Sequence, residues 1–179
     1  MGRRWPPCIA TDAWGSEMYL YTKQLYSLAH VALAMFLGAV IGFERELEDK
    51  PAGLRTHMLV GGAAALFVAL VDVVVGTLSA ELGGGLVRSD PVRIVEAVVT
   101  GVSFLGAGTI VLRRREHQVE GLTTAASILF TAGVGMCVAL SQVVLAVGAT
   151  VLVLVTLRGL GLMEPWLARH HLKKQRKMD

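Results

Sequence analysis

Long apolar stretches separated by short charged clusters dominate the pattern of side chains along this chain. The stretches cover about residues 24–43, 55–78, 91–112 and 121–157. The first and the last carry no charged side chain, whereas Asp72 interrupts the second, and Arg93 and Glu96 interrupt the third. Because a bilayer core of roughly 30 Å takes about 20 helical residues, the pattern predicts membrane-spanning helices.

The last stretch is too long for one span, since a helix over residues 121–157 would rise about 55 Å. We divide it at its most polar interior point, Ser141-Gln142, in preference to one long kinked helix. The third helix has a clear start signal, because Asp90 suits an N-cap and Pro91 suits the first helical position.

The predicted fold is therefore an all-α, polytopic transmembrane helix bundle with about five spans. The expected segments are an extracytoplasmic N-terminal arm at 1–23, a transmembrane domain at 24–162 with helices at about 24–43, 55–78, 91–112, 122–140 and 143–162, and a basic cytoplasmic tail at 163–179.

Composition and charge support this interpretation and add an orientation. Hydrophobic residues make up 54% of the chain and charged residues 17%, against roughly 25% charged residues in soluble domains. Twelve of the 17 Lys and Arg residues lie on one side of the membrane, which carries the tail, the loop between the first and second predicted helices and the loop between the third and fourth. The other five lie on the opposite side. The positive-inside rule then places the N-terminus outside and the C-terminus in the cytoplasm.

Polar residues gather where the first two predicted helices meet the cytoplasmic interface. This cluster consists of Glu44, Arg45, Arg55, Thr56 and His57. Ionisable groups at this depth need partners, so we expect an ion pair between Glu44 and Arg55. The alternative is that these are ordinary charged side chains that reach the interface from helix ends.

The segment G-L-T-T-A-A-S at 121–127 adds two hydroxyls at the start of the fourth helix. Thr123 or Thr124 is expected to cap that helix. Its free N–H groups could also receive an anion or a carboxylate from another helix.

Small residues predict where helices approach each other closely. Gly38 and Gly42 form one small face on the first helix, and Gly101, Gly106 and Gly108 lie within T-G-V-S-F-L-G-A-G-T at 100–109. We expect helix packing at these positions. A locally unwound segment that lines a cavity is the alternative for 100–109.

Asp72 and Glu96 are the remaining candidates for chemistry, because two carboxylates at neighbouring helix ends suit a hard cation such as magnesium. Arg93 lies one turn from Glu96 and could instead neutralise it. The chain shows no zinc motif, phosphate loop or nucleophile–base pair. We therefore expect no enzyme activity, no cofactor and no nucleic-acid partner.

Four motifs together resemble the MgtC/SapB family of bacterial inner-membrane proteins. They are L-G-A-V-I-G-F-E-R-E at 37–46, A-G-L-R-T-H-M-L-V at 52–60, F-L-G-A-G-T-I at 104–110 and G-L-T-T-A-A-S at 121–127. The resemblance covers about residues 30–140, with Ser103, Glu120 and Leu129 as departures from the family pattern. The positions that it carries over are Glu44, Arg45, Gly53, Arg55, Thr56, Gly106, Gly108, Thr123 and Thr124.

The resemblance implies a five-helix membrane domain in the bacterial inner membrane with its N-terminus outside. It also implies a role in magnesium limitation, with survival in host cells or under acid stress in some members. Many members carry a further soluble domain after the fifth helix. Family members resemble regulators more than pumps, so the expected function is non-enzymatic and acts through helix–helix contact with a membrane partner or through self-association.

Three alternatives remain open at this point. A cation transporter or channel for magnesium is the second functional hypothesis, because buried polar groups in a bundle often mark an ion path. The third is a structural membrane module without a site. In each case the lipid bilayer is a partner, and the basic tail is expected to contact anionic lipid.

Overall fold

The computed structural model describes residues 11–82, 91–111 and 121–175, and it places five helices along them. These are α1 (Thr11–Leu47), α2 (Leu54–Leu82), α3 (Pro91–Val111), α4 (Leu122–Ala139) and α5 (Val143–Gln175). No strand occurs within these ranges. The predicted all-α bundle is confirmed.

Four of the helices are long and apolar enough to cross a membrane. Their candidate spans are Leu20–Leu47, Leu54–Thr77, Val92–Ile110 and Leu122–Ala139. The apolar stretch of α5, Val143–Gly159, has 17 residues in the part whose side chains are described, at the lower limit for a helical span.

The helices are longer than the predicted spans at both ends of the chain. Helix α1 begins at Thr11, within the segment expected to be an arm, and α5 continues to Gln175, within the expected tail. Hydropathy locates the lipid-buried part of a helix, whereas the helix itself continues wherever its backbone hydrogen bonds do. The expected cap Asp90 and the arginines at 113–115 lie outside the described residues.

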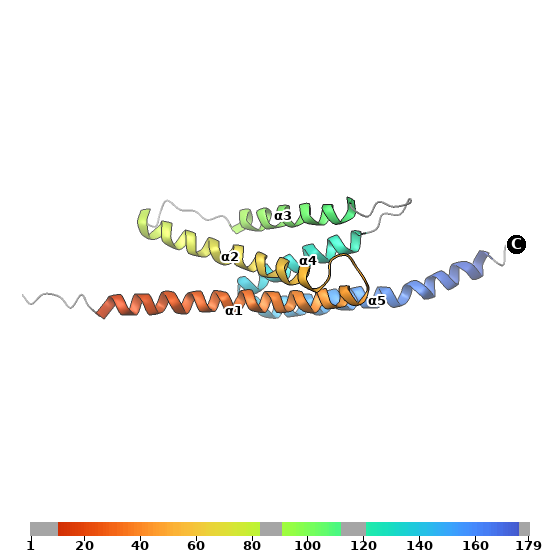
Figure 1. The fold of residues 1–179 in the computed structure, drawn as a ribbon, viewed down its shortest axis with the longest axis horizontal. Helices are drawn as coiled ribbons and strands as arrows, with labels where there is room; N and C mark the ends of the chain where they lie inside the picture. Colours follow the sequence, from red (N-terminus) through yellow and green to blue (C-terminus); the bar gives the residue numbers. More distant parts are fainter. Residues whose placement is uncertain (1–10, 83–90, 112–120, 176–179) are drawn as a thin grey trace, which may run out of the picture.

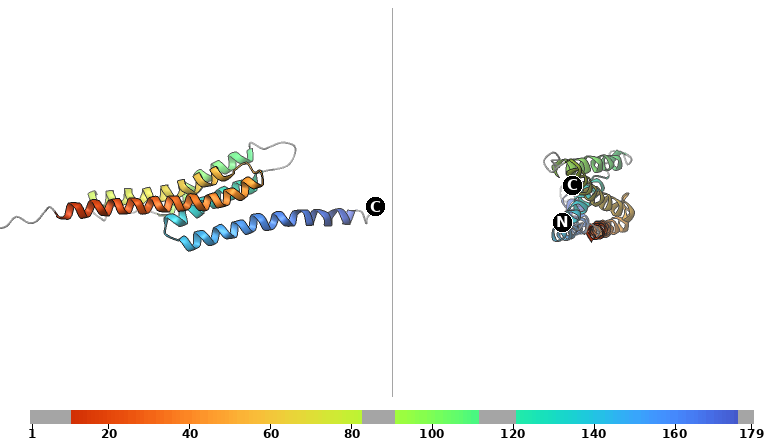
Figure 2. Two further views of the ribbon diagram at one scale, coloured as in Figure 1. Left: turned by 60° about the horizontal axis from the view of Figure 1, so that its bottom comes forward. Right: turned by 90° about the vertical axis from the view of Figure 1, so that its left-hand side faces the viewer.

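Successive helices run in opposite directions, so α1, α3 and α5 point one way and α2 and α4 the other (Figure 1). Helix α4 lies in the middle and contacts each of the other four helices. Figure 2 shows α3 at one edge of the bundle, beside α2 and α4 and away from α1 and α5. The ends of α1 and α5 therefore lie at the same end of the bundle as the starts of α2 and α4.

Glycines allow α1, α2 and α4 to approach backbone to backbone. A Cβ atom on Gly38 of α1 would collide with the backbone carbonyl oxygen of His57 on α2. A Cβ atom on Gly135 of α4 would likewise collide with the carbonyl oxygen of Gly61. Dispersion and close contact drive helix association in lipid, where the hydrophobic effect contributes little between helices. These contacts therefore fix the three-helix centre of the fold.

Two helices end in the same kind of turn, although neither turn contains glycine at its critical position. After α1, the N–H of Asp49 donates to Glu46 O and that of Lys50 to Arg45 O. After α4, the N–H of Ser141 donates to Val138 O and that of Gln142 to Cys137 O. Both are Schellman motifs, with Asp49 and Ser141 in the left-handed region at φ 53° and 60°.

A candidate polar site at one end of the bundle

Most of the buried polar residues that the structure describes collect at the end of the bundle where α1 finishes and α2 and α4 begin. The exceptions, Thr131 and Thr150, each donate a hydrogen bond to a carbonyl oxygen of their own helix. Glu44 and Arg45 come from α1, His57 from α2, and Thr124 and Ser127 from α4, and all five are buried. The structure therefore brings the first two sequence motifs together with the fourth. We call this group, with the residues that bind it, the polar cluster.

Glu44 forms an ion pair with Arg158 of α5, with 3.4 Å between Glu44 Oε1 and Arg158 Nε. The predicted pair with Arg55 is therefore wrong. Successive residues of a helix are rotated by about 100° around its axis. Leu54 and His57 lie on the face of α2 that contacts α1, so Arg55 points away from α1 and is exposed. Glu44 points to the other side of α1, where α5 lies.

Arg45 is 2% exposed and forms an ion pair at 3.2 Å with Glu48, three residues later in the turn that follows α1. Among the described residues its Nε has no hydrogen-bond partner. A buried guanidinium with an unsatisfied donor is costly. Arg45 is thus the least satisfied member of the polar cluster.

His57 connects α2 to α4 through its imidazole ring, which is fully buried. The ring Nδ1 lies 2.9 Å from Gly53 O, and because a carbonyl only accepts, Nδ1 carries the proton of that hydrogen bond. The ring Nε2 lies 3.1 Å from the Ser127 hydroxyl oxygen. That hydroxyl is also 2.9 Å from Thr124 O, so its single proton has two acceptors within reach.

Helix α2 is capped by a side chain from α1. Glu46 Oε2 accepts the backbone N–H of Leu54 at 2.8 Å, so a carboxylate lies at the positive end of the α2 dipole. A Cβ atom on Gly53 would lie 2.7 Å from the same oxygen. Glycine at position 53 therefore leaves room for the carboxylate beside the helix start.

The expected threonine cap of α4 is wrong. The helix begins at Leu122, and its N-cap is Gly121 at φ 98°, without a side-chain cap. Since Thr123 and Thr124 are already inside the first turn, neither can occupy the cap position. Thr124 is buried, Thr123 is exposed and Thr56 is half-buried.

Some of the glycines that were predicted to pack lie against a neighbouring helix, and others do not. Gly38, Gly42 and Gly106 each lie against a neighbouring helix; a Cβ atom on Gly106 would be 3.3 Å from that of Ala125. A Cβ atom on Gly101 or Gly108 would meet none of the described residues within 4 Å, so these two glycines do not pack closely against the described helices. Helix α3 is also continuous through 100–109, without the unwound segment weighed above.

Asp72 and Glu96 are both exposed, on α2 and α3. Glu96 lines a small polar hollow with Arg93, Ala97 and Thr100, and Asp72 does not. In the described part of the chain no three His, Cys, Asp or Glu side chains come together to hold a metal ion. The two carboxylates stay a prediction without further support.

Sequence reasoning missed several residues that complete the polar cluster. Ser127 closes the quoted G-L-T-T-A-A-S motif, and Arg158 ends the last apolar stretch, but neither was assigned a contact. Glu46 was likewise not recognised as a helix cap. A charge at the end of an apolar stretch signals the interface, yet its partner depends on how the helices are rotated.

The fold and the buried charges define a class first: a polytopic α-helical membrane protein whose buried ionisable residues, among those described, lie at one end of the bundle. Residues 31–166 match the MgtC family. The chain belongs to the MgtC family, which confirms the resemblance inferred from the four motifs. It is thereby a membrane protein of a magnesium-related family.

Curated relatives agree with this assignment. An uncharacterized protein of Haemophilus influenzae is 37% identical over 155 residues, covering 87% of this chain and 64% of that protein. "Putative magnesium transporter YhiD" of Escherichia coli K12 is 38% identical over 130 residues, covering 73% and 58%. "Protein MgtC" of Salmonella typhimurium is 38% identical over 127 residues, covering 71% and 49%. The chain thus spans about half to two thirds of these relatives, and no solved structure matches it.

Proposed function

We propose that this chain is a non-enzymatic protein of the bacterial inner membrane that supports adaptation to magnesium limitation by helix–helix contact with a membrane partner. The observation that carries the proposal is the separate pairing of the charges in the polar cluster. Glu44 binds Arg158, Arg45 binds Glu48, and His57 binds Gly53 and Ser127. An ion path needs polar groups along one continuous cavity, and these pairs instead stabilise helix ends and contacts.

An apolar cavity elsewhere in the bundle supports the same conclusion. It lies between α2 and α3, and none of the polar cluster residues lines it. Its walls are apolar except for Arg93. Such a cavity offers a hydrated cation no ligands, since magnesium prefers oxygen donors and keeps several of its waters.

Helix α3 is the surface that we assign to the partner. Only 11% of its span is buried, against 50% for α4, and Phe104 is 84% exposed. Gly108, one turn from Phe104, has open space around it. A small residue on an exposed transmembrane face allows another helix to approach closely.

In the proposed orientation, the polar cluster lies at the cytoplasmic end of the bundle and the N-terminus lies outside. The Lys and Arg distribution supports this orientation. Reporter domains fused to either terminus, one active only in the cytoplasm and one only outside it, test the orientation directly.

Photo-crosslinking in membranes tests the partner contact. A photoreactive residue at position 104, in cells grown at low magnesium, is expected to crosslink a second membrane protein. Gly108→Leu should reduce that crosslink several-fold, whereas Gly76→Leu, on α2 and also in open space, should not. Crosslinks to lipid and to the chain itself alone would contradict the proposal.

A cation transporter is the second candidate, supported by buried charges in a membrane bundle and by the printed name of the Escherichia coli relative. It predicts magnesium entry into vesicles that depends on the polar cluster. The first candidate predicts no such entry.

A further inference from the structure

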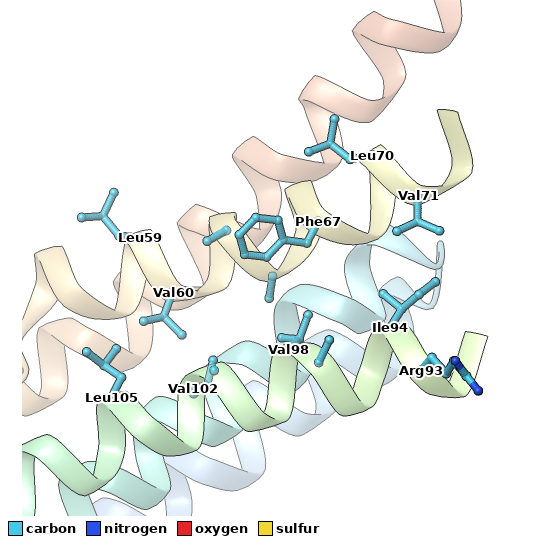
Figure 3. A pocket seen from close by; sticks show the side chains of 14 residues that line it. Leu59, Val60, Phe67, Leu70, Val71, Arg93, Ile94, Val98, Val102 and Leu105 are labelled. Carbon is cyan, nitrogen blue, oxygen red and sulfur yellow. The ribbon is translucent and has the colours of Figure 1, made fainter. Parts of the chain in front are cut away.

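A groove of about 750 Å³ separates α2 from α3 over much of their length (Figure 3). Leu59 and Leu105 lie at one end of it, and Val71 and Arg93 lie at the other. Of the fourteen lining residues, Arg93 is the one that carries a charge. The walls belong to two helices that both face the hydrocarbon core, so the occupant of the groove must be largely apolar.

The length of the groove matches one leaflet of a bilayer. The two ends of the groove are twelve helical steps apart, from Arg93 to Leu105 along α3 and from Leu59 to Val71 along α2. At 1.5 Å per step the groove is about 18 Å long. Half of the hydrocarbon core is about 15 Å thick. A membrane-spanning helix of a partner would need a groove of about twice this length.

Arg93 marks the headgroup end of the groove. It is the third residue of α3, so it lies where the helix enters the membrane, and it is exposed. Figure 3 shows its guanidinium pointing out beyond the end of the apolar lining. The planar fork of N–H donors on a guanidinium suits phosphate oxygens.

We propose that this groove is a binding site for an anionic phospholipid, with one acyl chain between α2 and α3 and the phosphate at Arg93. The chemistry is that of an amphiphile with a negative head and a straight apolar tail. The site belongs to the leaflet on the N-terminal side of the bundle, opposite the polar cluster. It is independent of the proposed partner contact at Phe104, which is not among the lining residues.

Among the described residues, Glu96 opposes the phosphate. Glu96 lies one turn from Arg93 and lines the adjacent polar hollow, not the groove. Its carboxylate weakens the attraction of an anionic head, so Glu96→Gln should increase the preference for anionic lipid.

Photoreactive lipids in vesicles of phosphatidylethanolamine test the site. Phosphatidylglycerol with a photoreactive acyl chain should label the α2 and α3 peptides that line the groove above the other lipid-facing peptides. Gly101→Leu, which projects a side chain into open space at the groove, should reduce that labelling several-fold. Arg93→Gln should lower the preference for phosphatidylglycerol over phosphatidylcholine by about fivefold and leave labelling by the acyl chain in place.

Matched controls separate the site from general lipid contact. Gly148→Leu fills open space on α5, and Lys23→Gln removes an exposed cation from α1; neither should change the labelling of the groove. Labelling spread evenly over all lipid-facing peptides, or unaffected by Gly101→Leu, would overturn the proposal. Equal labelling by both lipids would refute the role of Arg93, and a protein crosslinked within the groove would show a partner helix there instead.

Discussion

At the residue scale, rotation about the helix axis decides which charge binds which. Glu44 and Arg55 are close in sequence and both lie at the same end of the bundle, but only Glu44 is buried. The sequence pattern correctly located an interface rich in charge and assigned the wrong cation to Glu44. Residues near in depth are not near in space unless their helix faces meet.

A double-mutant cycle tests the partner of Glu44. Glu44→Gln and Arg158→Gln should couple by about 1 kcal/mol, with the magnitude limited by solvent screening because the Arg158 side chain is 70% exposed. Glu44→Gln and Arg55→Gln should be additive within about 0.3 kcal/mol. Unfolding of the purified protein in mixed micelles measures both cycles, and coupling to Arg55 alone would refute the assignment.

The contact between His57 and Ser127 makes a second prediction at this scale. Ser127→Ala leaves the buried ring Nε2 without its partner, which should lower the free energy of unfolding by about 1–2 kcal/mol. Thr123→Ala removes an exposed hydroxyl from the same helix and should change it by less than about 0.5 kcal/mol. Equal effects of the two changes would show that the hydrogen bond contributes nothing specific.

At the element scale, the apolar pattern predicted each helix because a span of hydrocarbon demands about 20 apolar residues. It could not predict where the helices end, since α1 and α5 continue through polar sequence. Nor could it show which glycines pack. Gly101 and Gly108 lie in a stretch rich in small residues, as Gly38 and Gly42 do. The neighbours of each glycine depend on the position of its helix in the bundle.

Two glycines of α4, two residues apart, give a matched test of helix packing. Gly135→Ala should destabilise the protein by about 2–3 kcal/mol, the usual range for overpacking, because its Cβ atom would collide with the carbonyl oxygen of Gly61. Gly133→Ala places its methyl group in open space and should be neutral or stabilise the helix by up to about 1 kcal/mol. Thermal unfolding in detergent measures the stability of both variants. A Gly133→Ala variant that is less stable than Gly135→Ala would contradict the packing.

The conformation of the turn between α4 and α5 explains why the sequence carries no clear signal for this helix boundary. A Schellman motif usually has glycine at the left-handed position, and here that position is Ser141. Ser141→Gly should raise the free energy of unfolding by about 1 kcal/mol, because it relieves the left-handed strain. Ser103→Gly, inside α3, should lower it by about 0.5 kcal/mol; a loss of stability in Ser141→Gly would show that the serine has another role.

At the scale of the whole molecule, the bundle separates its chemistry into two ends. The polar cluster joins α1, α2, α4 and α5 at one end, and the apolar groove with Arg93 opens at the other. The motifs predicted four of the five buried residues of the polar cluster, Glu44, Arg45, His57 and Thr124, because polar residues at the ends of apolar stretches are conspicuous in the sequence. They could not predict the groove, which depends on the gap between two helices of ordinary apolar composition.

The central claim is that the buried charges hold the bundle together and do not form an ion path. The most direct measurement is magnesium entry into liposomes, followed with an internal dye, for the wild-type chain, Glu44→Gln and the control Asp49→Asn. Asp49 is an exposed carboxylate at the end of the same helix, and asparagine tolerates its left-handed backbone. With insertion verified, all three should match protein-free vesicles. Entry in the wild type and in Asp49→Asn, lost in Glu44→Gln, would contradict the claim and identify a transporter.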